Sequence, residues 1–176
     1  MIYEPAEDSF LLKKEVKARA RGKKVLDVGT GSGIQARTAV EAGASQVLAV
    51  DVDQDVVESL KGDKFEVLES DLFENVSGKF DLIIFNPPYL PEDKREDSES
   101  ALATSGGRKG DEIIVRFLET VGDYLTEEGV VLLVVSSLTP LDEIEKVLKE
   151  KGFVKKVVAS EKVFMEELGV WEVRKT

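Results

Sequence analysis

The sequence predicts an α/β fold in which a mostly parallel sheet carries helices on both faces. Short apolar runs alternate with segments of helical spacing along the 176 residues, a pattern typical of βαβ units. The most apolar run, residues 129–136, predicts a central strand that is buried on both faces. The length corresponds to one domain, so we expect residues 1–176 to form a single domain.

The expected elements follow one another at short intervals. A helix over residues 6–20 precedes the first strand, within an N-terminal helical extension of residues 1–22. The last two strands come in succession, which predicts an antiparallel hairpin at the end of a seven-stranded sheet. The predicted strands are 24–28, 46–50, 65–68, 81–85, 129–136, 153–160 and 170–174, and the other predicted helices are 34–41, 54–61, 111–125 and 140–151.

The composition excludes several kinds of catalytic chemistry. The chain contains no cysteine and no histidine, which rules out disulfides, thiol nucleophiles, Ser-His-Asp triads and metal sites held by these residues. We therefore expect no metal site in this chain. Its chemistry must rely on carboxylates, amides, lysines, backbone groups and a cofactor.

The charge is strongly acidic, with a formal net charge of −11, which disfavours nonspecific binding to a phosphate backbone. Residues 13–24 are a basic exception, which indicates either a solvated helix face or a docking patch for an anionic partner. No apolar run approaches the ~20 residues that would cross a membrane. The first residues do not resemble a signal peptide, so we expect a cytoplasmic protein.

A glycine-rich turn, Gly29 to Gly33, follows the first predicted strand and opens a helix. Glycines allow a tight turn and let backbone N–H groups approach a ligand. Asp51, at the end of the second strand, can accept hydrogen bonds from two ribose hydroxyls. However, residues 31–36 also fit the dinucleotide pattern G-x-G-x-x-A. The turn alone therefore leaves NAD, or no ligand at all, as alternatives.

Three further features favour S-adenosylmethionine as the cofactor. Asp27 lies two residues before Gly29, and a carboxylate there suits an ammonium and a sulfonium better than a pyrophosphate. Asp71 follows the third strand and can accept from an adenine amino group, although an ordinary turn or helix cap is the alternative. The third feature is a motif after the fourth strand, which a dinucleotide site does not explain.

That motif is Asn86-Pro87-Pro88-Tyr89. The two prolines fix φ and remove two N–H donors, and Asn86 is held extended because a proline follows it. The side-chain oxygen of Asn86 and the carbonyl of Pro87 can both accept from one planar NH₂ group, while Tyr89 offers a face for stacking. We expect these four residues to hold an amide or an exocyclic amine for methylation, rather than to form a plain surface turn.

In these blocks the chain resembles the HemK/PrmC-like glutamine-methylating family of class I methyltransferases, and most closely its short archaeal and eukaryotic release-factor form. The blocks are Tyr3–Leu12, Asp27–Gly33, and Asn86–Tyr89 followed by Gly106–Gly110. The resemblance implies a Rossmann-like class I methyltransferase domain. It also implies methyl transfer from S-adenosylmethionine to a glutamine side-chain amide in the Gly-Gly-Gln loop of a peptide-chain release factor.

The resemblance further implies a set of site residues and a partner. Asn86 would bridge cofactor and substrate. A small zinc-binding activator subunit would add a strand to the sheet, and we expect it at the edge formed by residues 65–68. The zinc would belong to that partner. The implied cofactor residues are Ser9, Asp27, Gly29, Thr30, Gly31, Asp51, Val52, Asp71, Leu72 and Asn86.

Two other functions stay open at this point. Adenine and guanine methyltransferases share the Asn86–Tyr89 motif, which we call the elbow, because their targets are also planar NH₂ groups. The acidic balance disfavours DNA or RNA as a substrate, and only residues 13–24 offer the basic groove that a base-flipping enzyme needs. A non-catalytic scaffold or a dinucleotide binder would show no affinity for S-adenosylmethionine.

Overall fold

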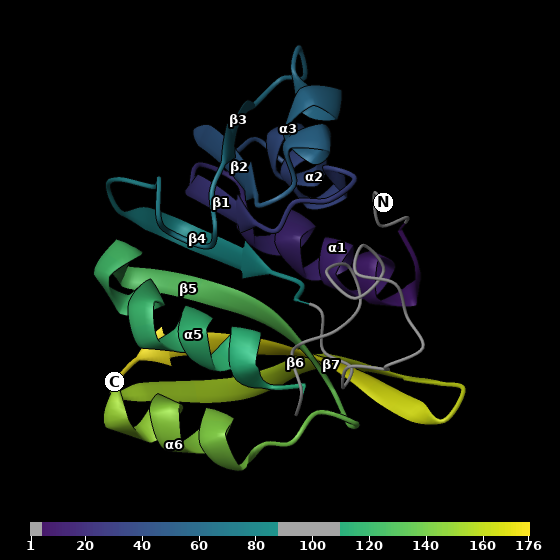
Figure 1. The fold of residues 1–176 in the computed structure, drawn as a ribbon, viewed down its shortest axis with the longest axis vertical. Helices are drawn as coiled ribbons and strands as arrows, with labels where there is room; N and C mark the ends of the chain where they lie inside the picture. The colour runs from purple at the N-terminus through teal and green to yellow at the C-terminus, as the bar shows by residue number, and fades with distance from the viewer. Residues whose placement is uncertain (1–4, 88–109) are drawn as a thin grey trace.

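The described strands form one seven-stranded sheet in the order β3-β2-β1-β4-β5-β7-β6. The computed structural model describes residues 5–87 and 110–176 (Figure 1). Strands β1 to β5 run parallel, and β7 pairs antiparallel with both β5 and β6. The predicted α/β fold with a terminal antiparallel hairpin is therefore confirmed.

The elements are α1 (Glu7–Arg19), β1 (Lys24–Val28), α2 (Ile34–Glu41), β2 (Gln46–Asp51), α3 (Gln54–Leu60), β3 (Glu66–Glu69), β4 (Phe80–Phe85), α5 (Glu112–Val121), a 3₁₀ turn (Gly122–Tyr124), β5 (Leu125–Ser136), α6 (Asp142–Glu150), β6 (Phe153–Val163) and β7 (Glu166–Lys175).

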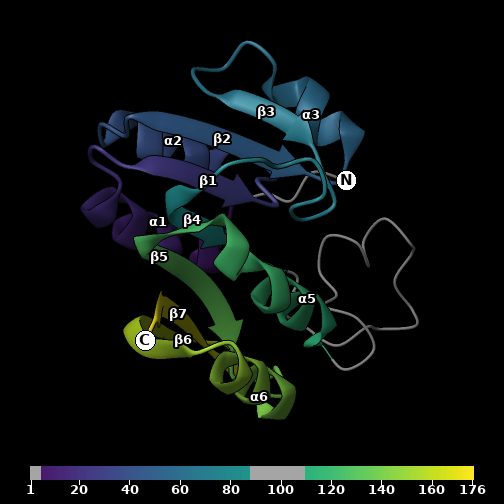
Figure 2. The same cartoon turned by 90° about the vertical axis from the view of Figure 1, so that its left-hand side faces the viewer.

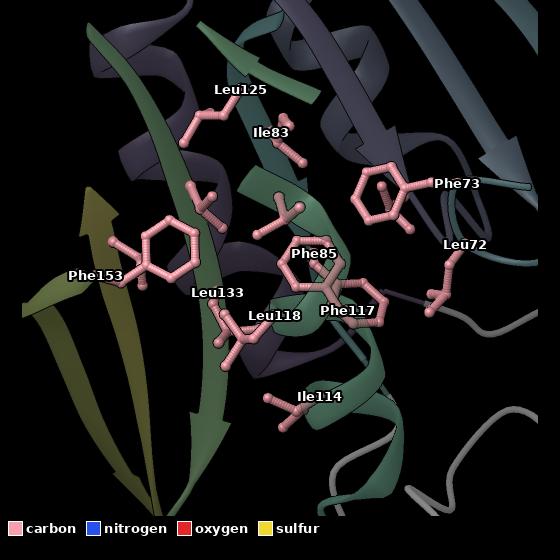
Figure 3. Close-up of a cluster of buried hydrophobic side chains, with 14 of the residues drawn as sticks. Leu72, Phe73, Ile83, Phe85, Ile114, Phe117, Leu118, Leu125, Leu133 and Phe153 are labelled. Atoms are coloured by element: carbon pink, nitrogen blue, oxygen red, sulfur yellow. The ribbon is translucent and has the colours of Figure 1, made fainter. Parts of the chain in front are cut away.

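Residues of the central strands alternate between two buried clusters, one on each face of the sheet, as the period of two in a strand requires. The cluster on the face of α5 and α6 is rich in aromatic side chains (Figure 3). In it, the ring of Phe85 stacks on Phe117 at 4.4 Å between centroids, and Phe73 stacks on Tyr124 at 4.6 Å. We call this side the aromatic face.

The opposite cluster lies under α1 and α2 and is built largely from alanine, valine and leucine. Its buried members include Ala36, Ala39 and Ala49, each with no exposed surface. Small side chains let helices approach a sheet and each other closely, and α1 and α2 pack against one another here. We call this side the small-residue face. Figures 1 and 2 show the helices divided between the two faces.

Several predicted boundaries differ from the structure, most of all at the start of β5, which was predicted at residue 129 and lies at Leu125, and in the final hairpin. The helix expected to reach Leu125 ends at Val121, because the chain tightens into a 3₁₀ turn and Leu125 already starts β5. The final hairpin is longer than predicted, since β6 runs to Val163 and β7 starts at Glu166. Polar residues near this turn join the strands through backbone pairing that an apolar pattern does not reveal. Among the residues described, no helix is long and apolar enough to cross a membrane.

Candidate active site

The carboxyl ends of the parallel strands meet at one edge of the sheet, where α/β folds place ligands. Figure 2 shows the arrowheads of β1, β2 and β3 pointing to the same side. The turn from β1 to α2 passes over this edge, and Gly29, Gly31 and Gly33 in it all have positive φ. At Gly33 a Cβ atom would lie only 2.9 Å from Leu60 Cδ2. The positive φ favours glycine at this position, and a larger residue would also require the Leu60 side chain to shift.

Asp51 ties the end of β2 to this turn. Its Oδ2 accepts a hydrogen bond from the backbone N–H of Gly31 at 3.0 Å, and its Oδ1 accepts from Asp53 N at 3.0 Å. Burial raises the pKa of Asp51, while these backbone hydrogen bonds lower it, with a net rise. Each carboxylate oxygen keeps acceptor capacity, so Asp51 is held in place and can still accept from hydroxyl groups of a ligand.

Asp27 lies directly beneath the turn and is 2% exposed. Its Oδ2 accepts from the hydroxyl of Thr30 at 2.7 Å. Burial raises the pKa of Asp27 from its ordinary value of 3.8 to about 7; hydrogen bonds from Thr30 and the Ala36 backbone oppose the rise, and the charge of Asp51 adds to it. Because this carboxyl group is poorly solvated, a nearby cation would stabilise its ionised form.

The residues after β2 and β3 differ in exposure. Val52 is 55% exposed and lies immediately after Asp51. Asp71 forms an ion pair with Arg116 of α5 at 3.2 Å. Leu72 is buried and has a φ of 52°, and its carbonyl accepts from the Ser70 hydroxyl at 2.8 Å. The structure thus places Val52, Asp71 and Leu72 after the ends of β2 and β3, with the Asp71 carboxylate directed to an arginine.

Asn86 follows β4 and has an amide oriented by a hydrogen bond. Its Nδ2 donates to Oδ2 of Asp8 in α1 at 3.0 Å. Its Oδ1 is buried and has no hydrogen-bond partner among the residues that the structure describes. A buried acceptor without a partner costs free energy, which is typical of a group prepared for a ligand. Pro87 is buried, whereas Pro88 and Tyr89 lie outside the described residues.

Ser9 lies beside Asp8 on the buried side of α1. Its backbone carbonyl accepts from Gln35 Nε2 at 2.9 Å. Gln35 is 4% exposed, and within the described part of the chain its Oε1 has no hydrogen-bond partner. This contact joins the first turns of α1 and α2 next to the glycine turn.

Asp8 and Gln35 are polar residues of this edge that no predicted motif contains as a site residue. A sequence signal for Asp8 does exist. It occupies the same helical face as Leu12 and Val16, at intervals of four residues, and all three are buried. An acid on the apolar face of a helix indicates a specific partner. Gln35 offers no comparable signal, because α2 is short and of mixed polarity.

The polar groups around the glycine turn fit S-adenosylmethionine as a ligand. Two acids, Asp27 and Asp51, lie under and beside the glycine turn. The buried carboxyl of Asp27 would repel a pyrophosphate but attract an ammonium or sulfonium. Asp51 has the place and acceptors for ribose hydroxyls. This chemistry separates the site from a dinucleotide site, which the glycine spacing alone left open.

Comparison with known proteins identifies the family. The family model described as "Methyltransferase small domain" matches residues 7–165. A Methanocaldococcus jannaschii protein named for protein N5-glutamine methylation is 42% identical over 96% of this chain and 89% of its own length. Human methyltransferase HEMK2 is 31% identical over 99% of this chain and 90% of its own length.

A solved structure agrees over the whole chain. It is the E. cuniculi Mtq2–Trm112 complex, described as responsible for methylating the translation termination factor eRF1. Its matching chain is 26% identical with a TM-score of 0.81, and the match covers 99% of this chain and 98% of that one. The chain therefore belongs to the methyltransferase small-domain family, among the HemK-like release-factor glutamine methyltransferases, and its methyl donor is S-adenosylmethionine.

Proposed function

We propose that this chain methylates the side-chain amide nitrogen of a glutamine in a peptide-chain release factor. The observation that carries the proposal is the oriented amide of Asn86, whose buried Oδ1 has no partner within the described residues. An acceptor held in this way suits an NH₂ group. The names of the relatives, which refer to glutamine N5 methylation and to eRF1, support a protein glutamine as the owner of that group.

The residues of the edge divide into two groups. Asp27 and the glycine turn would hold the charged end of S-adenosylmethionine, and Asp51 would hold its ribose. Ser9, Thr30 and Val52 complete the proposed lining, with Leu72 and Asp71 on the side of the adenine. In this arrangement Asp71 would have to exchange its ion pair with Arg116 for a bond to the adenine amino group. At 45% exposure of the Asp71 side chain, that pair is weak enough to exchange.

The second group acts on the substrate. We propose that Asn86 Oδ1 and the Pro87 carbonyl accept hydrogen bonds from the two N–H groups of the glutamine amide, with Pro88 and Tyr89 completing the elbow. These acceptors would hold the nitrogen lone pair toward the methyl group, since positioning supplies most of the acceleration where no strong base is present. The bound donor supplies an electrophilic methyl on sulfur. The methyl group would pass to the amide nitrogen, sulfur would keep the electron pair of its former bond to carbon, and the surplus proton of the nitrogen would pass to water.

The test is a methylation assay with labelled cofactor on three substrates. These are a release factor carrying Gly-Gly-Gln, the same protein with Gln replaced by Ala, and single-stranded DNA. We expect label on the first alone, and we expect Asn86→Ala to lose most turnover while keeping much of its cofactor affinity. Label on DNA in place of the release factor would overturn the proposal in favour of an exocyclic-amine methyltransferase.

We also propose that a small zinc-binding activator docks along β3. This strand lies at an edge of the sheet, and within the described residues it pairs only with β2. An edge strand presents free backbone donors and acceptors, and Leu68 is 37% exposed there. Mixing with such a subunit should raise turnover, whereas Leu68→Lys should prevent the gain. Because release factors act in translation, we place this activity in the cytoplasm.

A further inference from the structure

We propose that Asp8 is the positioning residue that decides which atom of Asn86 faces the substrate. This proposal rests on the proposed function and adds a residue to it. The carboxylate of Asp8 lies 3.0 Å from Asn86 Nδ2, across 78 positions of sequence. Asp8 is 3% exposed, so water screens this contact little.

The chemistry of the pair allows one orientation of the amide. An ionised carboxylate only accepts hydrogen bonds, whereas an amide has a donor side and an acceptor side. If the amide of Asn86 were turned by half a rotation, its oxygen would face the Asp8 carboxylate and both groups would repel. Asp8 therefore holds Nδ2 on the side of α1, which leaves Oδ1 for the substrate. This oxygen is the buried acceptor that has no partner among the described residues.

The helix that carries Asp8 is held at both ends. Near the site, Ser9 O accepts from Gln35 Nε2 at 2.9 Å. At the other end, Arg19 bonds Glu172 of β7 at 3.0 Å. Between these ends, the side chains of Leu12 and Val16 are fully buried. A carboxylate on so constrained an element holds its partner more tightly than one on a loop would.

The consequence is a preference for a substrate group that donates hydrogen bonds. With Oδ1 presented, the site accepts from an NH₂ group. With the amide reversed, Nδ2 would face the substrate and would favour a carboxylate or a carbonyl. The orientation set by Asp8 thus favours the nitrogen of a glutamine amide over the oxygen of a glutamate.

Single variants separate positioning from packing. Asp8→Ala should lower kcat for the release factor by about 100-fold, as expected when a reacting group loses its alignment, with the Kd for S-adenosylmethionine changed less than about threefold. Asp8→Asn keeps the shape but can offer either an oxygen or a nitrogen to Asn86, so an intermediate loss is expected. Glu7→Gln, on the exposed side of the same turn, is the matched control and should leave kcat unchanged.

A swapped pair provides the decisive experiment. In Asn86→Asp, two carboxylates would face each other, and we expect almost no turnover. When Asp8→Asn and Asn86→Asp are combined, the amide introduced at position 8 can donate to one oxygen of the carboxylate introduced at position 86. The other oxygen of that carboxylate is then left for the substrate. Adding Asp8→Asn should therefore lower kcat in the wild type but raise it at least about tenfold in the Asn86→Asp background.

The outcomes distinguish this inference from the proposed function. If Asp8→Asn lowers kcat in both backgrounds, Asp8 does not act through the orientation of Asn86, and the inference is wrong. If Asp8→Ala reduces cofactor binding and thermal stability as much as turnover, its role is structural and the inference is also wrong. If the wild type labels DNA and not glutamine, the proposed function fails, but the same swap can be measured on the adenine amino group.

Discussion

The two faces of the sheet are built from different side chains and do different work. The aromatic face holds buried phenylalanines and Trp171 beneath α5 and α6. The small-residue face holds alanines and short aliphatic side chains beneath α1 and α2. Because strand residues alternate, Asp27 continues the register of Val25, and Asn86 continues that of Leu82 and Ile84. Asp27 and Asn86 thus extend the small-residue face, whereas Asp71 pairs with Arg116 of α5 on the side of the aromatic face.

This difference shows how packing determines where chemistry is possible. Large rings bury much apolar area and stabilise the sheet. Small side chains allow α1 and α2 to pack closely, and the contact between Ser9 and Gln35 forms at their junction. The aromatic face is therefore expected to dominate stability, and the small-residue face to dominate cofactor binding and turnover.

The largest expected effect tests the aromatic face. Phe117 is fully buried and stacks on Phe85, so Phe117→Ala should lower the free energy of unfolding by about 3–5 kcal/mol. Urea denaturation measures this loss. The Kd for S-adenosylmethionine should change little at a temperature where the variant is folded. A loss below about 1 kcal/mol, within the range of a mild core truncation such as Ile→Val, would show that this face is less important than its packing suggests.

The second prediction concerns pH. The folded chain keeps the proton of Asp27 up to about pH 7, whereas the unfolded chain releases it near the ordinary pKa of 3.8. The folded state therefore binds more protons in this range, and Asp27 lowers the free energy of unfolding as the pH rises from about 4 to about 7. A shift of this size corresponds to roughly 4 kcal/mol at most.

Asp27→Asn removes that dependence. In the cofactor-free chain, the variant should gain stability over the wild type as the pH rises, with the gain complete above about pH 7. Urea titrations at about pH 5 and about pH 8, on either side of the folded pKa, measure the difference. The same variant should bind S-adenosylmethionine more weakly, because the carboxylate is lost. If the two chains show parallel pH profiles, Asp27 is not the buried carboxyl that governs stability in this range.

The third prediction is a smaller change in stability with a larger change in function. Ala39 is fully buried in the small-residue face, and Ala39→Leu should cost about 1–3 kcal/mol through overpacking. Because the added side chain would push α2 away, the Kd for S-adenosylmethionine should rise more than in Phe117→Ala. Calorimetry on both variants makes the comparison. Equal effects on the Kd would remove the proposed division of work between the faces.

The smallest effect is expected at the far end of α1. Burial raises the pKa of Glu172, but Arg174 and Arg19 outweigh it and hold the pKa below its ordinary value. Arg19→Ala should therefore lower the free energy of unfolding by roughly 0.2–1 kcal/mol. The loss should shrink at acidic pH, where Glu172 takes up a proton. A loss that stays constant down to about pH 3 would assign the effect to packing of the arginine side chain.

The sequence predicted the strands of the site better than the outer hairpin. Residues 24–28 form a strand as predicted, because a short apolar run that ends at a glycine turn is typical of a buried strand. The hairpin was predicted too short, since Glu161 and Lys162 pair through their backbone and carry no apolar signal. The glycine turn and Asn86 were recognisable because their chemistry lies in local motifs.

The contact of Asp8 with Asn86 could not be predicted in the same way. The two residues lie 78 positions apart, and their meeting depends on the order of the strands and on how closely α1 packs. The pairing of Asp71 with Arg116 spans 45 positions and is also a product of the fold. Local sequence identifies the reacting groups, whereas the groups that orient them come from distant elements.

The position of α1 has a practical consequence for handling the protein. Its first turn carries Asp8 and Ser9 at the site, whereas β7 ends near the opposite edge of the sheet, at Lys175 (Figure 1). Any segment fused directly ahead of α1 would start beside Asp8 and Ser9, and therefore close to Asn86, which Asp8 contacts. A segment joined at the end of β7 would start on the opposite side of the sheet, away from these residues.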